Sequence, residues 1–414
     1  MQTTIIKADS KKINASVRLP ASKSLSNRLL VIKHLCGEDF NIINLYDSSD
    51  TVLLGQLLQK NTCCGIIDMH DAGTPMRFLT AVYAITPGRR IIIGSGRLCR
   101  RPIGPLVETL KSLGAQIQYL GERGYLPISI DGSGIRGGKV CIDSEISSQF
   151  VSALLLIAPV LPDGLEISLK GIVVSAPYIN MTLGIMQQYG INVQRSDDRI
   201  IIAPQRYQPK DYVVENDWSA AAFWYEIAAL AEDAEIMLYG LKQHSLQGDA
   251  AVIDIFGKLG VSTAFVNDSV ILKKNQVKSN SLELDFTGTP DLFPAITATC
   301  AALNISCRFT GIRNLVLKES DRIMAMVTEL SRFGFPVKKI NDDTLIIESG
   351  RTVVKPAEIS CHTYNDHRIA MSLAPLSLTD FDVVLDDTSC VAKSYPAYLN
   401  NLKNAGFHIG IAEK

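Results

Sequence analysis

Short polar or glycine-bearing turns lead directly into apolar stretches of helix length at six places along the 414-residue chain. Two of these stretches, residues 150–160 and 220–230, have almost no polar face, and a helix that is apolar on all sides must be buried. Because Ser, Asp, Asn and Thr accept hydrogen bonds from the free amides of a first helical turn, each turn predicts a helix start. The turns are Ser22-Lys23-Ser24, Asp71-Ala72-Gly73-Thr74, Ser147-Ser148-Gln149, Asn216-Asp217-Trp218-Ser219, Gly288-Thr289-Pro290-Asp291 and Asn365-Asp366-His367-Arg368.

The turns recur at a nearly constant interval, which indicates an internal repeat. Successive intervals are 74, 70, 72 and 77 residues, measured between Gly73, Ser147, Asp217, Thr289 and Asp366. The first interval, from the Lys23 turn to the Gly73 turn, is only 50 residues. We therefore predict that the first of six units is shortened by about 20 residues.

The segments between the buried helices predict the rest of each unit. Short β-like runs alternate with amphipathic helices, and four of these helices end at a glycine that can adopt the left-handed C-cap conformation: Gly114, Gly190, Gly260 and Gly334. Each unit then reads strand, buried helix, strand, outer helix, strand, strand. This order favours α/β modules around central helices over one doubly wound sheet.

Composition narrows the class of protein without choosing a function. The formal net charge is −1, so a global basic field for nucleic acid or membrane is excluded and any cationic site must be local. The nine cysteines show no metal-ligand spacing, which is typical of reduced thiols in a cytosol. No apolar run reaches about 18 residues. We expect a cytoplasmic, unanchored chain.

Charged residues concentrate at the predicted helix starts. Lys23 and Arg28 lie in the first turns of one helix, and the segments 318–322 and 365–368 place Lys, Glu, Asp and Arg directly before two others. Cations are unfavourable near the positive end of a helix dipole, so an anionic ligand would explain them. Solvated surface ion pairs are the alternative for each cluster taken singly. Their recurrence at equivalent positions favours a shared cationic site.

The motifs at these positions occur in one order along nearly the full chain. They are 20–28 (PASKSLSNR), 72–77 (AGTPMR), 101–103 (RPI), 147–149 (SSQ), 175–178 (SAPY), 290–291 (PD), 318–322 (KESDR), 365–368 (NDHR) and 392–393 (AK). This series resembles the EPSP synthase family of enolpyruvyl transferases. The resemblance implies two domains, each of three βαβαββ units around buried parallel helices, an inside-out α/β barrel with the first unit shortened here. It also implies domains of residues 1–19 with 216–414 and of residues 20–215, with crossover hinges near Pro20 and Glu215.

The resemblance implies transfer of the enolpyruvyl group of phosphoenolpyruvate to the 5-hydroxyl of shikimate 3-phosphate, with release of phosphate. It implies no cofactor and no metal, and we expect a monomer whose partners are small molecules. The implied catalytic residues are Lys23, Asp291 and Glu319. The residues implied for shikimate 3-phosphate are Lys23, Ser24, Arg28, Ser147, Ser148, Gln149, Ser175, Tyr178, Asp291, Asn314 and Lys318. Those implied for phosphoenolpyruvate are Lys23, Gly73, Arg101, Gln149, Arg322, Arg368 and Lys393.

Two residues depart from the family pattern. Asp71 stands where the family usually has Asn, and Phe78 stands where it has Pro. A related enzyme that acts on UDP-N-acetylglucosamine shares the fold, but it has Lys-Asn where this chain has Lys23-Ser24. An anion-binding protein without turnover is a further alternative, motivated by Asp71 and the shortened unit, and the intact Lys23, Asp291 and Glu319 argue against it.

Overall fold

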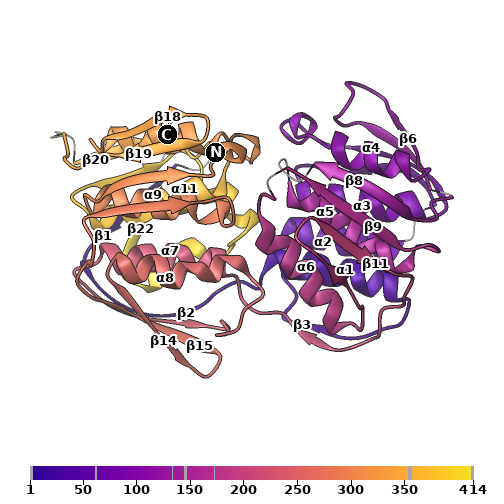
Figure 1. Cartoon of the computed structure of the whole chain (residues 1–414). Helices are drawn as coiled ribbons and strands as arrows, with labels where there is room; N and C mark the ends of the chain where they lie inside the picture. The colour runs from indigo at the N-terminus through magenta and orange to yellow at the C-terminus, as the bar shows by residue number, and fades with distance from the viewer. Residues whose placement is uncertain are drawn as a thin grey trace. The chain divides into compact units, whose positions relative to one another are not determined.

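The computed structural model describes residues 3–60, 63–132, 134–143, 147–171, 173–352 and 357–411. Contacts divide the chain into two compact units (Figure 1). We call Met1–Ser22 together with Glu215–Lys414 the C-terminal unit, and Lys23–Val214 the N-terminal unit. The expected crossover hinges near Pro20 and Glu215 stay a prediction.

The C-terminal unit contains three four-stranded sheets, each associated with one buried and one outer helix. The first comprises β2 (Lys12–Arg18), β13 (Asp233–Tyr239), β14 (Val261–Val266) and β15 (Ser269–Lys274), with α7 (Trp218–Leu230), η3 (Gly248–Ala251) and α8 (Val252–Lys258). The second comprises β16 (Ser281–Asp285), β17 (Ser306–Thr310), β18 (Val337–Asn341) and β19 (Thr344–Ile347), with η4 (Pro290–Leu292), α9 (Phe293–Ala302), η5 (Arg313–Leu317) and α10 (Arg322–Arg332). The third comprises β1 (Thr4–Ala8), β20 (Glu358–Cys361), β21 (Asp382–Leu385) and β22 (Phe407–Ile411), with α11 (His367–Leu373), η6 (Ala374–Leu378), η7 (Ser389–Lys393) and α12 (Tyr398–Asn404).

The two N-terminal strands complete two of these sheets. β1 pairs antiparallel with both β21 and β22, and β2 pairs parallel with β13 so that Ala15 lies opposite Ile236. In every four-stranded sheet one parallel pair flanks a buried helix, and the remaining pairs are antiparallel. This is the βαβαββ order predicted from the repeat.

The N-terminal unit contains two four-stranded sheets and one two-stranded sheet. The first repeat comprises α1 (Lys23–Cys36), β3 (Ile42–Ile43), α2 (Ser49–Lys60) and β12 (Tyr212–Val213). The second comprises β4 (Cys64–Asp68), α3 (Gly73–Ile85), β5 (Gly88–Ile93), η1 (Leu98–Arg100), α4 (Gly104–Ser112), β6 (Gln116–Tyr119) and β7 (Ile128–Gly132). The third comprises β8 (Gly138–Asp143), α5 (Ser148–Ile157), η2 (Ala158–Val160), β9 (Leu165–Lys170), α6 (Ala176–Gln188), β10 (Gln194–Arg195) and β11 (Arg199–Ile202).

The shortened first unit is confirmed by its sheet, which consists of β12 and β3 alone. α2 ends at Lys60 and β4 already begins at Cys64. The three intervening residues are too few for the two strands that follow the outer helix in the other repeats, so the missing part is the terminal hairpin.

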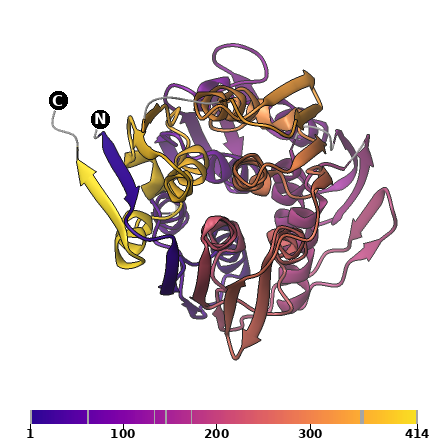
Figure 2. The ribbon, with the colours of Figure 1, turned by 90° about the vertical axis from the view of Figure 1, so that its left-hand side faces the viewer.

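The cores are built by the helices predicted to be buried. In α7 every residue from Trp218 to Ala229 is buried, and α7, α9 and α11 pack against one another. Figure 2, in which the C-terminal unit faces the viewer, shows its helices on the inside and its sheets around them. Phe286, Phe293 and Phe309 meet edge to face between the second sheet and α9. Helices of this kind must be buried because they have no face suited to water.

The predicted helix starts are correct in position, and the predicted side-chain caps are correct at three of them. Ser147, Asp217 and Asp366 accept hydrogen bonds from backbone amides in the first turns of α5, α7 and α11. A side-chain cap is wrong for α3, whose N-cap is Ala72. It is also wrong for the start at Thr289, where the single-turn η4 precedes α9 and no side chain caps either helix.

The glycine C-caps are confirmed by backbone geometry. The residues are Gly114, Gly190, Gly260 and Gly334, with φ values of 100°, 82°, 87° and 78°. Positive φ favours glycine, because a Cβ would be strained there. Across the described segments, no helix is long and apolar enough to cross a membrane. All nine cysteines are free thiols.

Candidate active site

The implied site residues fall into two groups, one in each unit. The N-terminal unit carries Lys23, Ser24, Arg28, Gly73, Arg101, Ser147, Ser148, Gln149, Ser175 and Tyr178. The C-terminal unit carries Asp291, Asn314, Lys318, Glu319, Arg322, Arg368 and Lys393. Within each unit most of these residues lie at the starts of helices, as the repeat predicts.

Arg28 is buried in the N-terminal unit and fastens three helices together. Its Nε donates to the Thr182 hydroxyl at 2.7 Å, and one terminal nitrogen donates to Ser152 Oγ at 3.2 Å and to the Tyr178 carbonyl at 3.1 Å. The other terminal nitrogen donates to the Ser24 carbonyl at 2.9 Å. These contacts use four of the five N–H donors of a guanidinium. Arg28 therefore holds α1 to α5 and α6, and a direct contact with substrate stays a prediction.

Burial lowers the pKa of Arg28 to about 10, against a smaller opposing contribution from Tyr178. The side chain stays charged at neutral pH. The ring of Phe78, one of the two departures from the family pattern, has its centroid 5.6 Å from the Arg28 guanidinium carbon. An aromatic face stabilises a cation held above it, so Phe78 stabilises the charged form of Arg28.

Gly73 and Arg101 lie against each other at the start of α3. A Cβ at position 73 would be 2.6 Å from a terminal nitrogen of Arg101 and 3.0 Å from one of Arg77. The Gly73 carbonyl accepts a hydrogen bond from Arg77 at 3.0 Å, and Arg77 lies over the Phe150 ring at 5.3 Å. Only glycine lets the Arg101 guanidinium approach the backbone this closely. The structure thus brings together two residues implied for phosphoenolpyruvate.

Gln149 joins the start of α5 to the start of α3. Its side-chain amide donates to Thr74 Oγ1 at 3.1 Å, and its backbone N–H donates to the capping Ser147 Oγ at 3.3 Å. The side-chain carbonyl oxygen is buried and accepts no hydrogen bond from the described residues. A buried acceptor of this kind is costly unless a donor reaches it. Ser148 is buried beside it in the first turn of α5.

Ser175 and Tyr178 form the start of α6. Ser175 is a buried N-cap residue with φ 57° and ψ 38°, in the left-handed region. Such a conformation is uncommon for serine and is maintained by the surrounding structure. The Ser175 carbonyl accepts a hydrogen bond from the Tyr178 N–H at 3.0 Å, and the Tyr178 carbonyl accepts one from Arg28.

Lys23 has a partner that sequence reasoning missed. Its Nζ lies 3.4 Å from Asp50 Oδ2, and both side chains are partly buried. Asp50 lies in the first turn of α2. An acidic residue near a predicted helix start is the sequence signal that could have suggested it as a partner for Lys23. Asp71, the other departure from the family pattern, is exposed and accepts a hydrogen bond from Ser95 Oγ at 3.0 Å.

Asp291 is the centre of the second group, in the C-terminal unit. Its Oδ1 lies 2.9 Å from Arg322 and 3.6 Å from Lys318 Nζ, and its Oδ2 lies 2.9 Å from Arg368. The three cations come from different elements: Lys318 follows η5, Arg322 opens α10 and Arg368 lies in the first turn of α11. Residues that are up to 77 positions apart in the sequence therefore surround one carboxylate.

Arg322 connects three carboxylates although its side chain is only 1% exposed. Besides Asp291, it contacts Glu319 at 2.8 Å and Asp366 at 2.9 and 3.3 Å. Asp366 is buried, accepts a hydrogen bond from Ser320 Oγ at 2.9 Å and caps α11. Sequence reasoning found Asp366 as a helix cap and missed it as the main partner of Arg322. The rigid fork of a guanidinium suits such multiple contacts.

The surrounding charges determine the ionisation of this group. Burial by itself would raise the pKa of Asp291, but Arg368, Lys318 and Arg322 outweigh burial and hold that pKa well below its usual range. Burial would lower the pKa of Arg322, but the charges of Asp366, Glu319 and Asp291 raise it above its usual value. Asp291 is therefore an ionised carboxylate in the ligand-free protein.

The two remaining implied residues of the C-terminal unit, Asn314 and Lys393, lie in short helical segments. Asn314 is half-buried in η5, and Lys393 is the half-buried last residue of η7. Within the described segments, no group of three or more His, Cys, Asp and Glu side chains could hold a metal ion.

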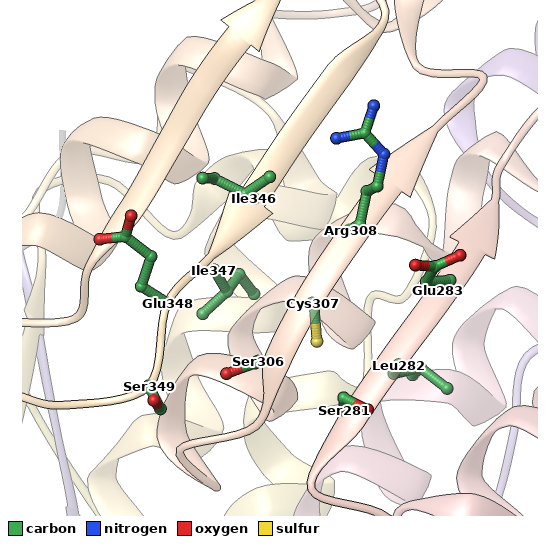
Figure 3. A pocket seen from close by; sticks show the side chains of 10 residues that line it. All are labelled: Ser281, Leu282, Glu283, Ser306, Cys307, Arg308, Ile346, Ile347, Glu348 and Ser349. Atoms are coloured by element: carbon green, nitrogen blue, oxygen red, sulfur yellow. The ribbon is translucent and has the colours of Figure 1, made fainter.

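A separate surface depression of about 590 Å³ lies over strands β16, β17 and β19. Figure 3 shows the side chains that line it, among them Glu283, Arg308 and Glu348 on the exposed face of the sheet. With two carboxylates and a single guanidinium among its lining side chains, the depression does not suit a dianionic ligand. The depression contains none of the implied site residues, so we do not regard it as the active site.

Known proteins match this chain in sequence over the segments that carry both groups of site residues. A sequence model described as EPSP synthase (3-phosphoshikimate 1-carboxyvinyltransferase) matches residues 54–402. A curated 3-phosphoshikimate 1-carboxyvinyltransferase of Bacteroides fragilis (strain YCH46) is 43% identical over 405 residues, covering 97% of this chain and 98% of the relative. The chain belongs to the EPSP synthase family. A Vibrio campbellii protein of the same name is 34% identical and covers 95% of this chain and 97% of its own length.

Solved EPSP synthase structures share the fold. A structure from Acinetobacter baumannii superposes with a TM-score of 0.78 at 22% sequence identity and covers 100% of both chains. A second EPSP synthase structure from the same organism gives 0.77 at 21% identity. At this level of identity the likeness shows the fold alone. It confirms the expected two-domain enolpyruvyl transferase fold for this member of the EPSP synthase family.

Proposed function

We propose that this chain transfers the enolpyruvyl group of phosphoenolpyruvate to the 5-hydroxyl of shikimate 3-phosphate and releases phosphate. Family membership supports the reaction class. The observation that carries the proposal at the level of residues is the ionised Asp291, held among Arg322, Arg368 and Lys318. Each substrate bears a phosphate and a carboxylate, and guanidinium and ammonium groups are the side chains that bind such anions.

The N-terminal unit supplies donors for both substrates in this proposal. Ser147, Ser148 and Ser175 offer hydroxyls at helix starts, where free amides and the helix dipole favour phosphate. The buried carbonyl oxygen of Gln149 suits a substrate hydroxyl, because a donor there would satisfy it. Arg101 beside Gly73 and Lys23 beside Asp50 supply positive charge for phosphoenolpyruvate.

The chemical steps are an addition followed by an elimination. The 5-hydroxyl oxygen attacks C2 of phosphoenolpyruvate while Asp291 orients that hydroxyl and accepts its proton, and C3 gains a proton, a transfer that we assign to Lys23 and Glu319. The tetrahedral intermediate then loses a proton from C3 and expels phosphate from C2, which restores the double bond. Proton transfer by placed side chains typically contributes about 10² to 10⁴ in rate.

The low pKa of Asp291 in the ligand-free protein fits this sequence of events. A carboxylate neutralised by three cations is a weak base. When anionic substrates bind, they share the charge of Arg322, Arg368 and Lys318, and the pKa of Asp291 rises toward a range that suits a general base. Substrate binding therefore switches on the base.

The proposal includes a monomer that works in the cytoplasm. All the implied residues come from one chain, so no second copy is required to complete the set. The nine free thiols are typical of a reducing compartment. A single sedimenting species near 45.2 kDa is the expected result at enzyme concentrations used for assay, and a stable dimer would contradict it.

A phosphate-release assay with both substrates tests the function. We expect release that requires both substrates, and a fall in kcat of about 10² to 10⁴ in Asp291→Asn. Asp254→Asn is the matched control, because Asp254 is exposed on α8 and its replacement should leave turnover unchanged. Release without shikimate 3-phosphate, or full turnover in a folded Asp291→Asn, would contradict the proposal.

A further inference from the structure

Asp249 is a buried carboxyl group that the mechanism above does not use. It lies in η3 and is 3% exposed. Its Oδ2 accepts a hydrogen bond from the Ser219 hydroxyl, while its Oδ1 is buried and has no hydrogen-bond partner among the described residues. An ionised carboxylate is poorly tolerated in such a position, because half of its charge would be neither solvated nor hydrogen-bonded. A protonated Asp249 avoids that cost.

The position of Asp249 is fixed by the start of α7. The side chain of Gln247, two residues earlier, donates to Glu215 Oε2 at 3.0 Å and to the Asn216 carbonyl at 2.7 Å, and it accepts a hydrogen bond from the Trp218 N–H at 3.1 Å. Ser219, which binds Asp249, lies in the first turn of the same helix. Asp249 is therefore held in place rather than free to swing into solvent.

The elements that hold Asp249 (η3), Asp291 (η4) and Arg368 (α11) all pack against α7, and the charges of Asp291 and Arg368 act on Asp249. Burial and the negative charges of Asp291 and Asp217 favour the neutral form of Asp249, and Arg368 and the Ser219 hydroxyl favour its ionised form.

The outer helix α8 also packs against η3. It carries Asp254 and Lys258, which are exposed and act weakly on Asp249 through water. The balance raises the pKa of Asp249 to about 7, with burial as the largest cause.

Asp249 and Asp291 thus respond to one environment in opposite ways. The pKa of Asp291 is held well below its usual range, chiefly because Arg368, Lys318 and Arg322 outweigh its burial. Paired carboxyl groups whose environments separate their pKa values divide the roles of acid and base in many active sites. Here one group is an ionised partner for three cations, and the other can hold a proton near neutral pH.

We propose that Asp249 is a positioning residue of the candidate site, whose proton leaves the charge of Arg368 available to the anionic substrate. This inference rests on the proposed function, since it takes phosphoenolpyruvate as the anion that Arg368 binds. When Asp249 loses its proton, a second negative charge joins that of Asp291 near the same guanidinium and competes with the substrate. The affinity for phosphoenolpyruvate therefore falls as Asp249 ionises.

Steady-state kinetics across the pH range test this proposal. The KM for phosphoenolpyruvate is measured from about pH 6 to pH 8.5, spanning the proposed ionisation, for the wild type and Asp249→Asn, which keeps an acceptor for Ser219. Dividing the KM of the wild type by the KM of Asp249→Asn at each pH removes the contribution of the substrate's own ionisation. We expect this ratio to rise by about five- to tenfold across the range, with a much smaller change in kcat. A ratio that stays constant with pH overturns the proposal.

Ser219→Ala provides a second variant that retains Asp249. The Ser219 hydroxyl favours the ionised carboxylate, so its removal should move the midpoint of the KM transition to higher pH. A purely structural role for Asp249 predicts no such movement. An unchanged or lowered midpoint in a folded Ser219→Ala would count against the assignment.

Infrared difference spectroscopy of the ligand-free protein separates this proposal from the proposed function. The wild type should show a protonated carboxyl C=O band that disappears with a midpoint near pH 7, and Asp249→Asn should lack it. If this band behaves as expected but neither protein releases phosphate, the proposed function fails and the protonation of Asp249 stands. If turnover is normal and the band persists in Asp249→Asn, the proposal for Asp249 is wrong.

Discussion

Glu226 makes the stability of the C-terminal unit depend on pH. It lies in the middle of α7 with 0% exposure, and neither carboxyl oxygen has a hydrogen-bond partner among the described residues. Burial raises its pKa well above the usual value, and no described cation opposes that shift. The folded protein therefore keeps Glu226 protonated under conditions in which the unfolded chain ionises it.

The sign and size of the effect follow from proton linkage. Because the folded state holds the proton more tightly, stability is greatest below the unfolded pKa of about 4.3 and falls as pH rises toward the folded pKa. Each pH unit within that window costs about 1.4 kcal/mol. The wild type should therefore lose stability through this group as pH rises above 5, for as long as the pH stays below the folded pKa.

Glu226→Gln tests this reasoning because it keeps the shape and removes the ionisation. Urea unfolding at pH 5, 6, 7 and 8 should give a free-energy difference between variant and wild type that moves in favour of the variant as pH rises, by up to about 1.4 kcal/mol per unit below the folded pKa. Glu226→Leu should show the same slope and be more stable throughout, since it also removes a buried polar group at about 1–3 kcal/mol. Glu232→Gln, at an exposed site just after α7, is the control. Parallel pH profiles for wild type and Glu226→Gln would refute the argument.

Two further predictions concern the candidate site. In Gly73→Ala the new Cβ would be 2.6 Å from Arg101, so the flexible guanidinium must move; we expect KM for phosphoenolpyruvate to rise about tenfold or more with little loss of thermal stability, and an unchanged KM would contradict this. Arg322→Lys leaves Asp291 and Asp366 without their shared fork and should cost about 3–5 kcal/mol in urea unfolding. Arg308→Lys, exposed on β17, should change stability by less than about 0.5 kcal/mol, and an equal loss in both variants would argue against the role of burial.

Much of the fold could be predicted because its signals are local. The starts of α5, α7 and α11 depend on capping side chains within three residues of the amides they bind. The glycines that end four outer helices depend on one backbone angle each. Repetition of such signals gave the six units and showed that the first was short. The shortening of the first unit followed from spacing alone, and the sheet then showed that the missing part is the terminal hairpin.

The contacts within the site could not be predicted in the same way. Lys23 contacts Asp50 from another helix, and Arg322 contacts Asp366 across 44 residues of sequence. The motif around Arg28 implies a contact with shikimate 3-phosphate, yet three of its N–H groups donate to the neighbouring helices α5 and α6 and a fourth donates within α1. Which of these groups meet depends on how the helices pack.

The sequence by itself determined where the buried helices begin and where four outer helices end, because those boundaries depend on residues a few positions apart. Only the tertiary structure decided which carboxyl groups are ionised. Asp291 is half-buried, and Asp249 and Glu226 are buried, all in the same unit, and nothing in their local sequence distinguishes them. Among the described residues, Arg322, Arg368 and Lys318 surround the first, Arg368 opposes the burial of the second, and burial is the cause given for the third. In a medium of low dielectric constant those neighbours determine the charge of each.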